Sequence, residues 1–395
     1  MNILCICQYY YPEPFRISDI CEEFVKIGHK VTVITGIPNY PMGKIYEDYR
    51  FSRKKTESIN GVEVHRCFTV GRKRGWLWRI LNYYSYLFSS KRFVSKLPGD
   101  YDVVFVNQLS PVMMAEAGIK YKNKYGKRLI LYCLDLWPES LVAGRVRRNS
   151  FIYRYFHKVS GKIYSQSDKI LITSKSFKTY FENEFNIRDD KINYLPQYAE
   201  ELFSVESCKK QPNDTIDLMF AGNIGNAQSV QTIIKAADLT RDIKNLKWHI
   251  VGDGSELDNC KILAEKYNLK SVVFYGRKPV EQMPKYYAMA DAMIITMQSD
   301  PVLSLTVPGK LQTYMLAGKP IIGAINGETY SIIKKADCGY AGEAEDQYAL
   351  ANNVRLFILN RDNTFGENSY NYYLKNFSKN TFCKTLLNEF KLCVI

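Results

Sequence analysis

The chain has 395 residues, of which 46% are hydrophobic and 24% are charged, and its formal net charge is +14. This balance is typical of folded proteins and excludes a disordered chain or a fibrous repeat. Since a single core stops growing at roughly 250 to 300 residues, the length predicts two domains. The N-terminus shows no secretory signal and no apolar run approaches the roughly 20 residues that span a bilayer, so we expect a cytoplasmic protein.

The positive charge is confined to one half of the sequence. Residues 1–199 hold 32 Lys and Arg against 18 Asp and Glu, a net charge of +14, whereas residues 200–395 hold 22 against 22. A one-sided excess predicts that the first half faces an anionic partner. The ten cysteines lie mostly in apolar runs without metal-ligand spacing and the four histidines are scattered, so we expect reduced, packed cysteines and no metal site.

The first half begins with a strand, a helix and a second strand. NILCICQ is followed by the turn-rich YYYPEPF, by apolar residues that recur at helical spacing over 17–27, and then by KVTVITG. Further buried strands are predicted at 101–108, 128–135 and 168–174. This alternation predicts a Rossmann-like α/β domain over 1–196.

The second half repeats the pattern after a break. Residues 197–215 lose all periodicity and gather Pro, Asn, Asp and Ser, which indicates a linker. Strands then alternate with helical segments over 216–365, at 216–222, 246–254, 271–276, 292–297 and 319–325. We expect the final helical stretch, 366–395, to pack back on the first domain. Two Rossmann-like domains in tandem predict a cleft between the carboxyl ends of their strands.

Three loops of the second domain carry glycines directly after a strand, in FAGNIGN, IVGDGSEL and FYGRKP. Glycine allows a backbone to approach a ligand closely. Any one of these loops is also compatible with an ordinary turn, but three in one domain favour a ligand site. The candidate donor-binding residues in the first two loops are Gly222, Asn223, Gly225, Gly252 and Gly254.

The segment VPGKLQTYMLAGKP at 307–320 predicts a short helix that Pro308 and Gly309 open, with Lys310 in its first turn. The unpaired amides of a helix start, together with a lysine, suit a diphosphate. The alternative is a solvated surface lysine. Because a cation at a helix start is unfavourable without a partner, we favour the anionic ligand.

Three loops of the first domain, at 12–16, 36–49 and 135–140, combine rigid prolines with charged groups at strand ends. A carboxylate there can orient or deprotonate an acceptor hydroxyl. For Asp135 an equal alternative is a helix N-cap, with the following Pro and Glu in the first turn. The candidate acceptor-side residues are Glu13, Arg16, Asn39, Lys44, Asp135 and Glu139.

Two stretches combine basic and aromatic residues without any acid. Residues 72–96 hold seven Lys and Arg with seven aromatics, and residues 145–162 hold six Lys and Arg. This mixture suits an anionic membrane surface. Single-stranded nucleic acid uses the same mixture, and a solvated helix face is the simplest alternative. Because tryptophans are unusual on a solvated face, we favour the membrane, expect no nucleic acid, and select Arg72, Lys73, Arg74, Trp76, Trp78 and Arg79.

Several long strings occur in a fixed order along nearly the whole chain: QYYYPEPFR at 8–16, GIPNYPMGK at 36–44, DLWPES at 135–140, FAGNIGNAQ at 220–228, VGDGSEL, FYGRKPVEQMP at 274–284 and VPGKLQTYMLAGKP at 307–320. With these strings the chain resembles glycosyltransferase family 4. It is most similar to the bacterial polysaccharide subgroup that includes the O-antigen N-acetyl-L-fucosamine transferases.

The resemblance implies a GT-B fold, a nucleotide-sugar donor bound mainly by the second domain, and transfer with retention and without a metal. It further implies a UDP-sugar co-substrate, no cofactor, and a polyprenyl diphosphate-linked saccharide acceptor at the inner face of the plasma membrane. Lys310 and Arg277 would stabilise the leaving diphosphate, while Asp135 or Glu13 guides the acceptor hydroxyl.

Two pairs of positions depart from the wider family. Leu305 and Thr313 stand where most members carry two glutamates, and Asn223 and Gln228 replace an Arg and a Lys. The ribose and phosphate contacts must therefore come from other residues, for which we select Arg277, Lys310 and Glu328. Two further hypotheses remain: a nucleotide-sugar epimerase on the same two-domain plan, and a catalytically degenerate scaffold of a polysaccharide assembly complex.

Overall fold

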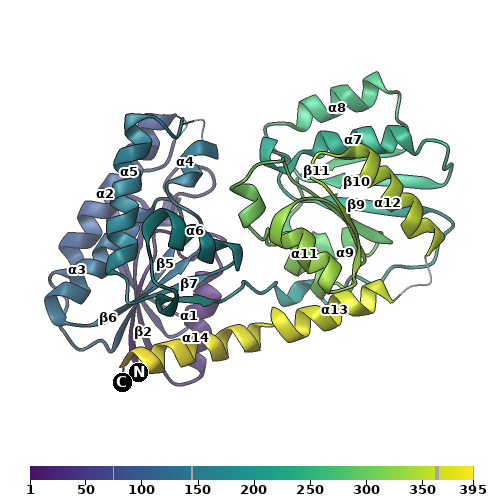
Figure 1. Ribbon diagram of the computed structural model, residues 1–395. Coiled ribbons are helices and arrows are strands. Elements are labelled where there is room, and N and C mark those ends of the chain that lie inside the picture. Colours follow the sequence, from purple (N-terminus) through teal and green to yellow (C-terminus); the bar gives the residue numbers. More distant parts are fainter. Residues whose placement is uncertain (74, 144–145, 361–363, 395) are drawn as a thin grey trace. The chain divides into compact units, whose positions relative to one another are not determined.

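The computed structural model describes residues 1–73, 75–143, 146–360 and 364–394 (Figure 1). The chain forms two compact units. The first comprises Met1–Thr173, Phe177–Leu195 and Cys383–Ile395, and the second comprises Ser174–Ser176 and Pro196–Phe382. Each unit is an α/β domain with its own sheet, as the alternation of strands and helices predicts.

The first unit contains an eight-stranded sheet with the order β3-β4-β2-β1-β5-β6-β7-β8. Its strand pairs are parallel except that of β3 with β4. The strands are β1 (Asn2–Ile6), β2 (Lys30–Gly36), β3 (Thr56–Ile59), β4 (Val62–Cys67), β5 (Val103–Gln108), β6 (Arg128–Cys133), β7 (Lys169–Ile172) and β8 (Ile192–Tyr194).

The β3–β4 hairpin and β8 do not appear among the sequence-based predictions. Asn60 and Gly61, between β3 and β4, have φ angles of 48° and 84°. An Asn-Gly pair with both φ angles positive is the preferred two-residue hairpin turn. The string SINGVEV therefore contained the evidence for this hairpin.

Helices accompany the first sheet, as Figure 1 shows. They are α1 (Ile17–Lys26), α2 (Trp76–Val94), α3 (Glu116–Tyr125), α4 (Glu139–Ala143), α5 (Phe151–Gln166), α6 (Ser176–Phe185) and α14 (Lys379–Val394). From Cys383 onward the last helix belongs to this unit. There Phe390 packs on Phe24 and Phe105, with ring centroids 5.4 and 5.3 Å apart, and Asn193 donates to Glu389 at 2.6 Å.

The second unit contains a six-stranded parallel sheet with the order β11-β10-β9-β12-β13-β14. The strands are β9 (Ile216–Ala221), β10 (Leu246–Val251), β11 (Val272–Gly276), β12 (Ala292–Thr296), β13 (Ile321–Ala324) and β14 (Gly339–Gly342). The helices are α7 (Val230–Leu239), α8 (Leu257–Lys266), α9 (Met283–Tyr287), α10 (Lys310–Leu316), α11 (Gly327–Lys335), α12 (Gln347–Leu359) and α13 (Phe365–Asn376). Helix α13 packs on α10 within this unit, so the stretch 366–395 is divided between the two units.

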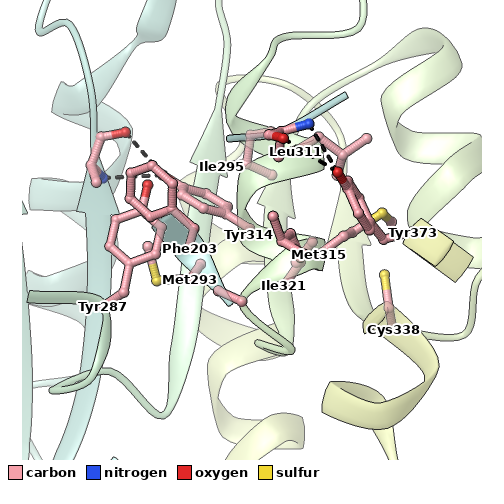
Figure 2. Packing of buried hydrophobic residues seen from close by; sticks show 14 of the residues in the cluster. Phe203, Tyr287, Met293, Ile295, Leu311, Tyr314, Met315, Ile321, Cys338 and Tyr373 are labelled. Atoms are coloured by element: carbon pink, nitrogen blue, oxygen red, sulfur yellow. Dashed lines mark hydrogen bonds between the residues drawn. The ribbon is translucent and has the colours of Figure 1, made fainter. Parts of the chain in front are cut away.

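One of the two buried clusters of the second unit joins α10 to the sheet (Figure 2). Leu311, Tyr314 and Met315 of α10 lie in this cluster with Met293 and Ile295 of β12. Burial of such side chains stabilises the fold by roughly 1.5–3 kcal/mol each. Helix α10 is therefore held on one face by the core, which fixes the position of its first residue, Lys310.

Among the described residues, all ten cysteines are free and eight are buried. No group of three or more His, Cys, Asp or Glu in the described ranges is arranged to hold a metal ion. Over the same ranges no helix is both long and apolar enough to cross a bilayer.

Candidate active site

The loops that follow β9, β10 and β11 meet at the carboxyl end of the second sheet. The Gly222 N–H donates to the Val251 carbonyl at 2.9 Å, and the Gly252 N–H donates to the Gly276 carbonyl at 3.0 Å. A Cβ on Gly252 would lie 1.8 Å from the Gly222 carbonyl oxygen, and the φ angle of Gly252 is 147°. Only glycine fits this contact, so the backbones of the two loops pack directly on each other.

Lys310 extends its side chain to this junction. Its Nζ lies 3.8 Å from the centroid of the Phe220 ring, and a Cβ built on Gly222 would lie 3.1 Å from the same Nζ. The residue is partly exposed as a whole, but its Nζ is buried and has no hydrogen-bond partner among the described residues. Burial lowers the pKa of Lys310 to about 7. A solvated surface lysine, the alternative that the sequence left open, does not fit these observations.

Tyr314 holds the start of α10 against β9. Its hydroxyl accepts from the Ala221 N–H at 3.1 Å and donates to the Ala221 carbonyl at 3.0 Å, as the dashed lines in Figure 2 mark. Since Ala221 precedes Gly222, this pair of hydrogen bonds sets the register between Lys310 and the glycine junction. Tyr314 is not among the residues predicted from the sequence, because a tyrosine in a helix predicts packing rather than positioning.

Other candidate residues for the sugar donor lie in the same loops, after β9, β10 and β11. Asn223 donates to Gln228 at 2.9 Å, and the Gly225 N–H donates to Gln228 at 3.2 Å, so Gln228 orders the loop after β9. A Cβ on Gly254 would lie 2.3 Å from the Ile224 carbonyl, another direct backbone contact. Arg277 follows β11 and is exposed.

Pro308 and Gly309 precede α10, with Gly309 at the N-cap. Glu328, at the second position of α11, accepts from the Ser174 hydroxyl and from the Ser176 N–H, the latter at 2.9 Å. One oxygen of Glu328, Oε2, makes both bonds. Glu328 therefore has hydrogen-bond partners within the protein, and the ribose contact for which the sequence selects it stays a prediction.

In the first unit, Glu13 lies at the centre of a loop junction. It is 2% exposed, and its carboxylate accepts the backbone N–H groups of Asn39 at 2.8 Å, Tyr40 at 2.7 Å and Tyr10 at 3.4 Å. Burial raises the pKa of Glu13 to about 7. Glu13 therefore connects the loop after β1 to the loop after β2. This geometry makes it a positioning residue, and its proposed role toward an acceptor hydroxyl stays a prediction.

Asp135 lies after β6 and receives two serine hydroxyls. Ser110 and Ser140 each donate to its carboxylate at 2.6 Å, and the Trp137 indole donates to Ser110 at 2.5 Å. Burial raises the pKa of Asp135. Because α4 begins at Glu139, Asp135 is not the N-cap of that helix. The two serines were missed because isolated serines carry no spacing pattern.

The remaining acceptor candidates differ in exposure. Glu139 is buried, and its carboxylate accepts hydrogen bonds from Tyr153 at 2.7 Å, Tyr180 at 3.3 Å and Arg148 at 2.7 Å. These three partners satisfy a buried carboxylate in a structural role. Asp135 and Glu139 thus have separate hydrogen-bond partners. Arg16 is half-buried near Tyr132, whereas Lys44 is exposed.

A hollow of about 460 Å³ lies between the loop after β2 and the start of α2. Its described lining residues include no acid but three cations, Arg72, Lys73 and Arg79, together with Asn39 and Tyr40. Asn39 accepts the Arg72 N–H at 3.1 Å, which joins the two sides of the hollow. Residues that the sequence assigned separately to an acceptor and to a membrane are therefore adjacent. We call this hollow the loop pocket.

Helix α2 presents an apolar stripe to the outside. Trp76 is 74% exposed, and Leu77, Ile80, Leu81 and Phe88 are also exposed. Trp78 is only partly exposed, because the Lys73 Nζ lies 4.4 Å from its ring centroid. Arg74 lies outside the described residues. Phe151, Ile152 and Tyr155 of α5, in the same unit, are exposed as well.

Comparison with known proteins assigns both units. The family model described as Glycosyltransferase Family 4 matches residues 16–197, and the model described as Glycosyl transferases group 1 matches residues 206–372. The chain is built from two glycosyltransferase domains. It is similar to the probable glycosyltransferase WbjE of Pseudomonas aeruginosa, with 25% identity over 68% of each chain. It is also similar to the putative colanic acid biosynthesis glycosyl transferase WcaI of Escherichia coli K12, with 24% identity over 91% of this chain and 92% of that one.

Solved structures agree on the fold. The sucrose-phosphate synthase of Thermosynechococcus elongatus superimposes with a TM-score of 0.77 at 14% identity, covering 99% of this chain and 98% of that one. HepE of Anabaena in complex with UDP superimposes with a TM-score of 0.73 at 14% identity, covering 99% and 100%. The expected GT-B architecture of two α/β domains with parallel sheets is confirmed.

Proposed function

We propose that this protein is a hexosyltransferase that moves an N-acetylated sugar from a UDP-sugar to a lipid-linked saccharide during synthesis of a bacterial surface polysaccharide, O-antigen or capsule. The two glycosyltransferase domains and the polysaccharide-related names of its relatives support the reaction class. The resemblance to the N-acetyl-L-fucosamine transferases supports the sugar type. One observation carries the proposal: the buried Lys310 amine without a hydrogen-bond partner among the described residues, beside the glycine junction.

The lysine amine suits a leaving diphosphate. A buried amine with a pKa near 7 regains its proton when a multiply charged anion arrives, because the anion stabilises the ammonium form. The charge then opposes the negative charge that develops on the diphosphate as the glycosidic bond breaks. Arg277, which is exposed after β11, is the second cation that we propose for this role. With this positive charge supplied by side chains, we propose a retaining transfer that needs no metal.

The acceptor role belongs to the first unit. The loop pocket offers three cations and the Asn39 side chain at a loop that Glu13 fixes, and it suits the diphosphate of a polyprenyl carrier. Asp135, held by two serine hydroxyls, has a raised pKa and is the group we propose to accept the hydroxyl proton. Glu13 is proposed to act on the acceptor through the loops that it joins.

A membrane-bound acceptor also fits the outer surface of the first unit. Its sequence holds 33 Lys and Arg against 19 Asp and Glu, a net charge of +14, whereas the second unit holds 21 against 21. The apolar stripe of α2 lies in the charged unit. Basic residues around exposed apolar side chains favour peripheral binding to an anionic leaflet. We therefore propose that the protein acts at the cytoplasmic face of the membrane.

The deciding experiment offers a panel of UDP- and other NDP-sugars together with a polyprenyl diphosphate-linked saccharide, and measures the mass of the lipid product. We expect one N-acetylated UDP-sugar to add a single residue, and Lys310→Ala to abolish this addition. A changed sugar nucleotide without acceptor would favour the epimerase. Binding of UDP without any product across the panel would favour the scaffold.

A further inference from the structure

A second hollow of the first unit, about 430 Å³ in volume, lies beside the edge strands rather than at the loop pocket. One wall is the C-terminal end of α2, with Arg92 and Phe93, together with Lys96 just beyond the helix. The other is formed by Lys54 and Lys55, just before β3, and by Arg66 and Phe68 at the end of β4. We call it the edge pocket. Among the residues that the structure describes, its lining contains five cations and no acid.

Two of the five cations have carboxylate partners. Arg66 pairs with Glu57, its Nε donating at 2.7 Å, and Lys54 lies 3.4 Å from Asp48. For Lys55, Arg92 and Lys96, by contrast, no ion pair is found within the part of the chain that the structure describes. Three positive charges around one hollow therefore lack a neutralising carboxylate.

Arg66, in the second wall of the edge pocket, gives an independent indication of a ligand. The Arg66 side chain is 1% exposed, and its Nη1 atom is buried without a hydrogen-bond partner among the described residues. A buried guanidinium normally satisfies all of its donors, since each unsatisfied donor destabilises the fold. An anion in the pocket would offer an acceptor for Nη1, for which the described residues supply none.

We propose that the edge pocket binds a phosphate-bearing ligand with an apolar portion, at a site separate from the glycine junction. A single carboxylate would neutralise one of the three unpaired cations, whereas a phosphate monoester or diphosphate carries two or more charges and several acceptor oxygens. The hollow is also much larger than an inorganic ion, and the aromatic rings of Tyr49, Phe68 and Phe93 in its lining provide an apolar surface. The phosphate has two possible sources, a membrane lipid headgroup or a soluble phosphate compound.

Protection of lysines from acetylation, read residue by residue by mass spectrometry, tests the site directly on the full chain. The probes are inorganic pyrophosphate, a soluble short-chain phosphatidate, and the matching zwitterionic phosphatidylcholine. We expect the first two to slow acetylation of Lys55 and Lys96 and the third to have no effect. Exposed Lys30 and Lys120 of the same unit serve as internal controls and should react at an unchanged rate. Protection by phosphatidate alone would identify a lipid headgroup, and equal protection by pyrophosphate a soluble phosphate.

Arg92→Gln should raise the probe concentration for half-protection of Lys55 and Lys96 about fivefold, the effect of one cation next to an anionic group. Lys30→Gln removes the same charge from the same unit and should leave this probe concentration unchanged. Failure of both phosphate probes to protect these lysines, equal protection of Lys30 and Lys120, or an equal effect of the two variants would overturn the proposal. None of these readings depends on sugar transfer or on UDP binding.

Discussion

Replacing Lys310 by methionine separates the two properties of its amine, the cost to stability and the benefit to binding. Methionine keeps the length and flexibility of the side chain but removes the charge and the proton donors. It should fill the space beside Phe220 and Gly222 that the Lys310 Nζ now occupies. We expect the variant to be more stable than the wild type and to lose UDP binding and transfer.

The size of the stability change follows from the pKa. The pKa of Lys310 is about 7 in the folded protein, and the pKa of a lysine in an unfolded chain is about 10.4. At pH 7.5 this difference lowers the unfolding free energy by about 4 kcal/mol. Because the Lys310 residue as a whole is partly exposed, screening by solvent reduces this cost by about half. We therefore expect Lys310→Met to raise the unfolding free energy of the second unit by about 2 kcal/mol, which is roughly 4–8 °C in Tm for a unit of this size.

The pH dependence has a definite sign. Between pH 7 and 10 the unfolded chain holds a proton on Lys310 that the folded chain lacks, so the stability of the wild type rises with pH in this window. The methionine variant has no such proton. The difference between the two proteins should therefore be largest below pH 7 and should narrow as the pH approaches 10.

Thermal and chemical unfolding at pH 6.5, 8 and 9.5, with calorimetric titration of UDP, provide the measurements. Lys244→Met, at an exposed lysine of the same unit, is the matched control and should change neither stability nor UDP affinity. If Lys310→Met is no more stable than the control, the amine is solvated in solution. If the variant keeps its UDP affinity, the amine does not meet the diphosphate.

Three further predictions use the same sites. Binding of UDP to the wild type at pH 8 should take up roughly one proton, measured by calorimetry in two buffers of different ionisation enthalpy, and no uptake would contradict a neutral Lys310. Asp135→Asn should lower the transfer rate at least about tenfold while UDP affinity stays unchanged, and equal losses of both would refute its acceptor-side role. Glu13→Gln keeps the oxygen that accepts two N–H groups, so this variant should keep its fold and most of its activity. Glu13→Ala should lower the unfolding free energy of the first unit by about 2 kcal/mol, as measured by denaturant titration. Loss of transfer in a stable Glu13→Gln variant would show that Glu13 is catalytic.

The fold was predictable because periodicity and glycine placement are local properties. The buried strand series marked both sheets, whereas the β3–β4 hairpin was missed because β3 has only four residues, none of them buried, and β4 interrupts its buried positions with more exposed ones. The place of Lys310 after Pro308 and Gly309 makes it a candidate phosphate ligand from the sequence, and this role stays a prediction. That its amine is buried was not predictable, since this depends on Tyr314 fixing α10 to β9, a contact between residues 93 positions apart.

The net charge of the first unit does not by itself identify the partner that this unit binds. An excess of +14 fits a membrane, a nucleic acid or a solvated face equally well, and only the placement of the cations distinguishes these. Helix α2 has 19 residues, a length of about 28 Å. Lys73 and Arg79 line the loop pocket near its start, Arg92 and Lys96 line the edge pocket near its end, and exposed apolar side chains lie between them.

A helix with cations at both ends and an apolar stripe between them suits a position in the plane of a membrane interface, with both ends at headgroup depth. The prediction for such a position is specific. Binding to anionic vesicles should weaken as salt rises, since screening acts on the cations, but some binding through the apolar side chains should remain at high salt. Trp76→Ser with Leu77→Ser should remove the binding that remains at high salt. Arg79→Gln with Arg92→Gln should remove the part of the binding that depends on salt. Equal sedimentation of both variants and the wild type would show that α2 is an ordinary solvated helix.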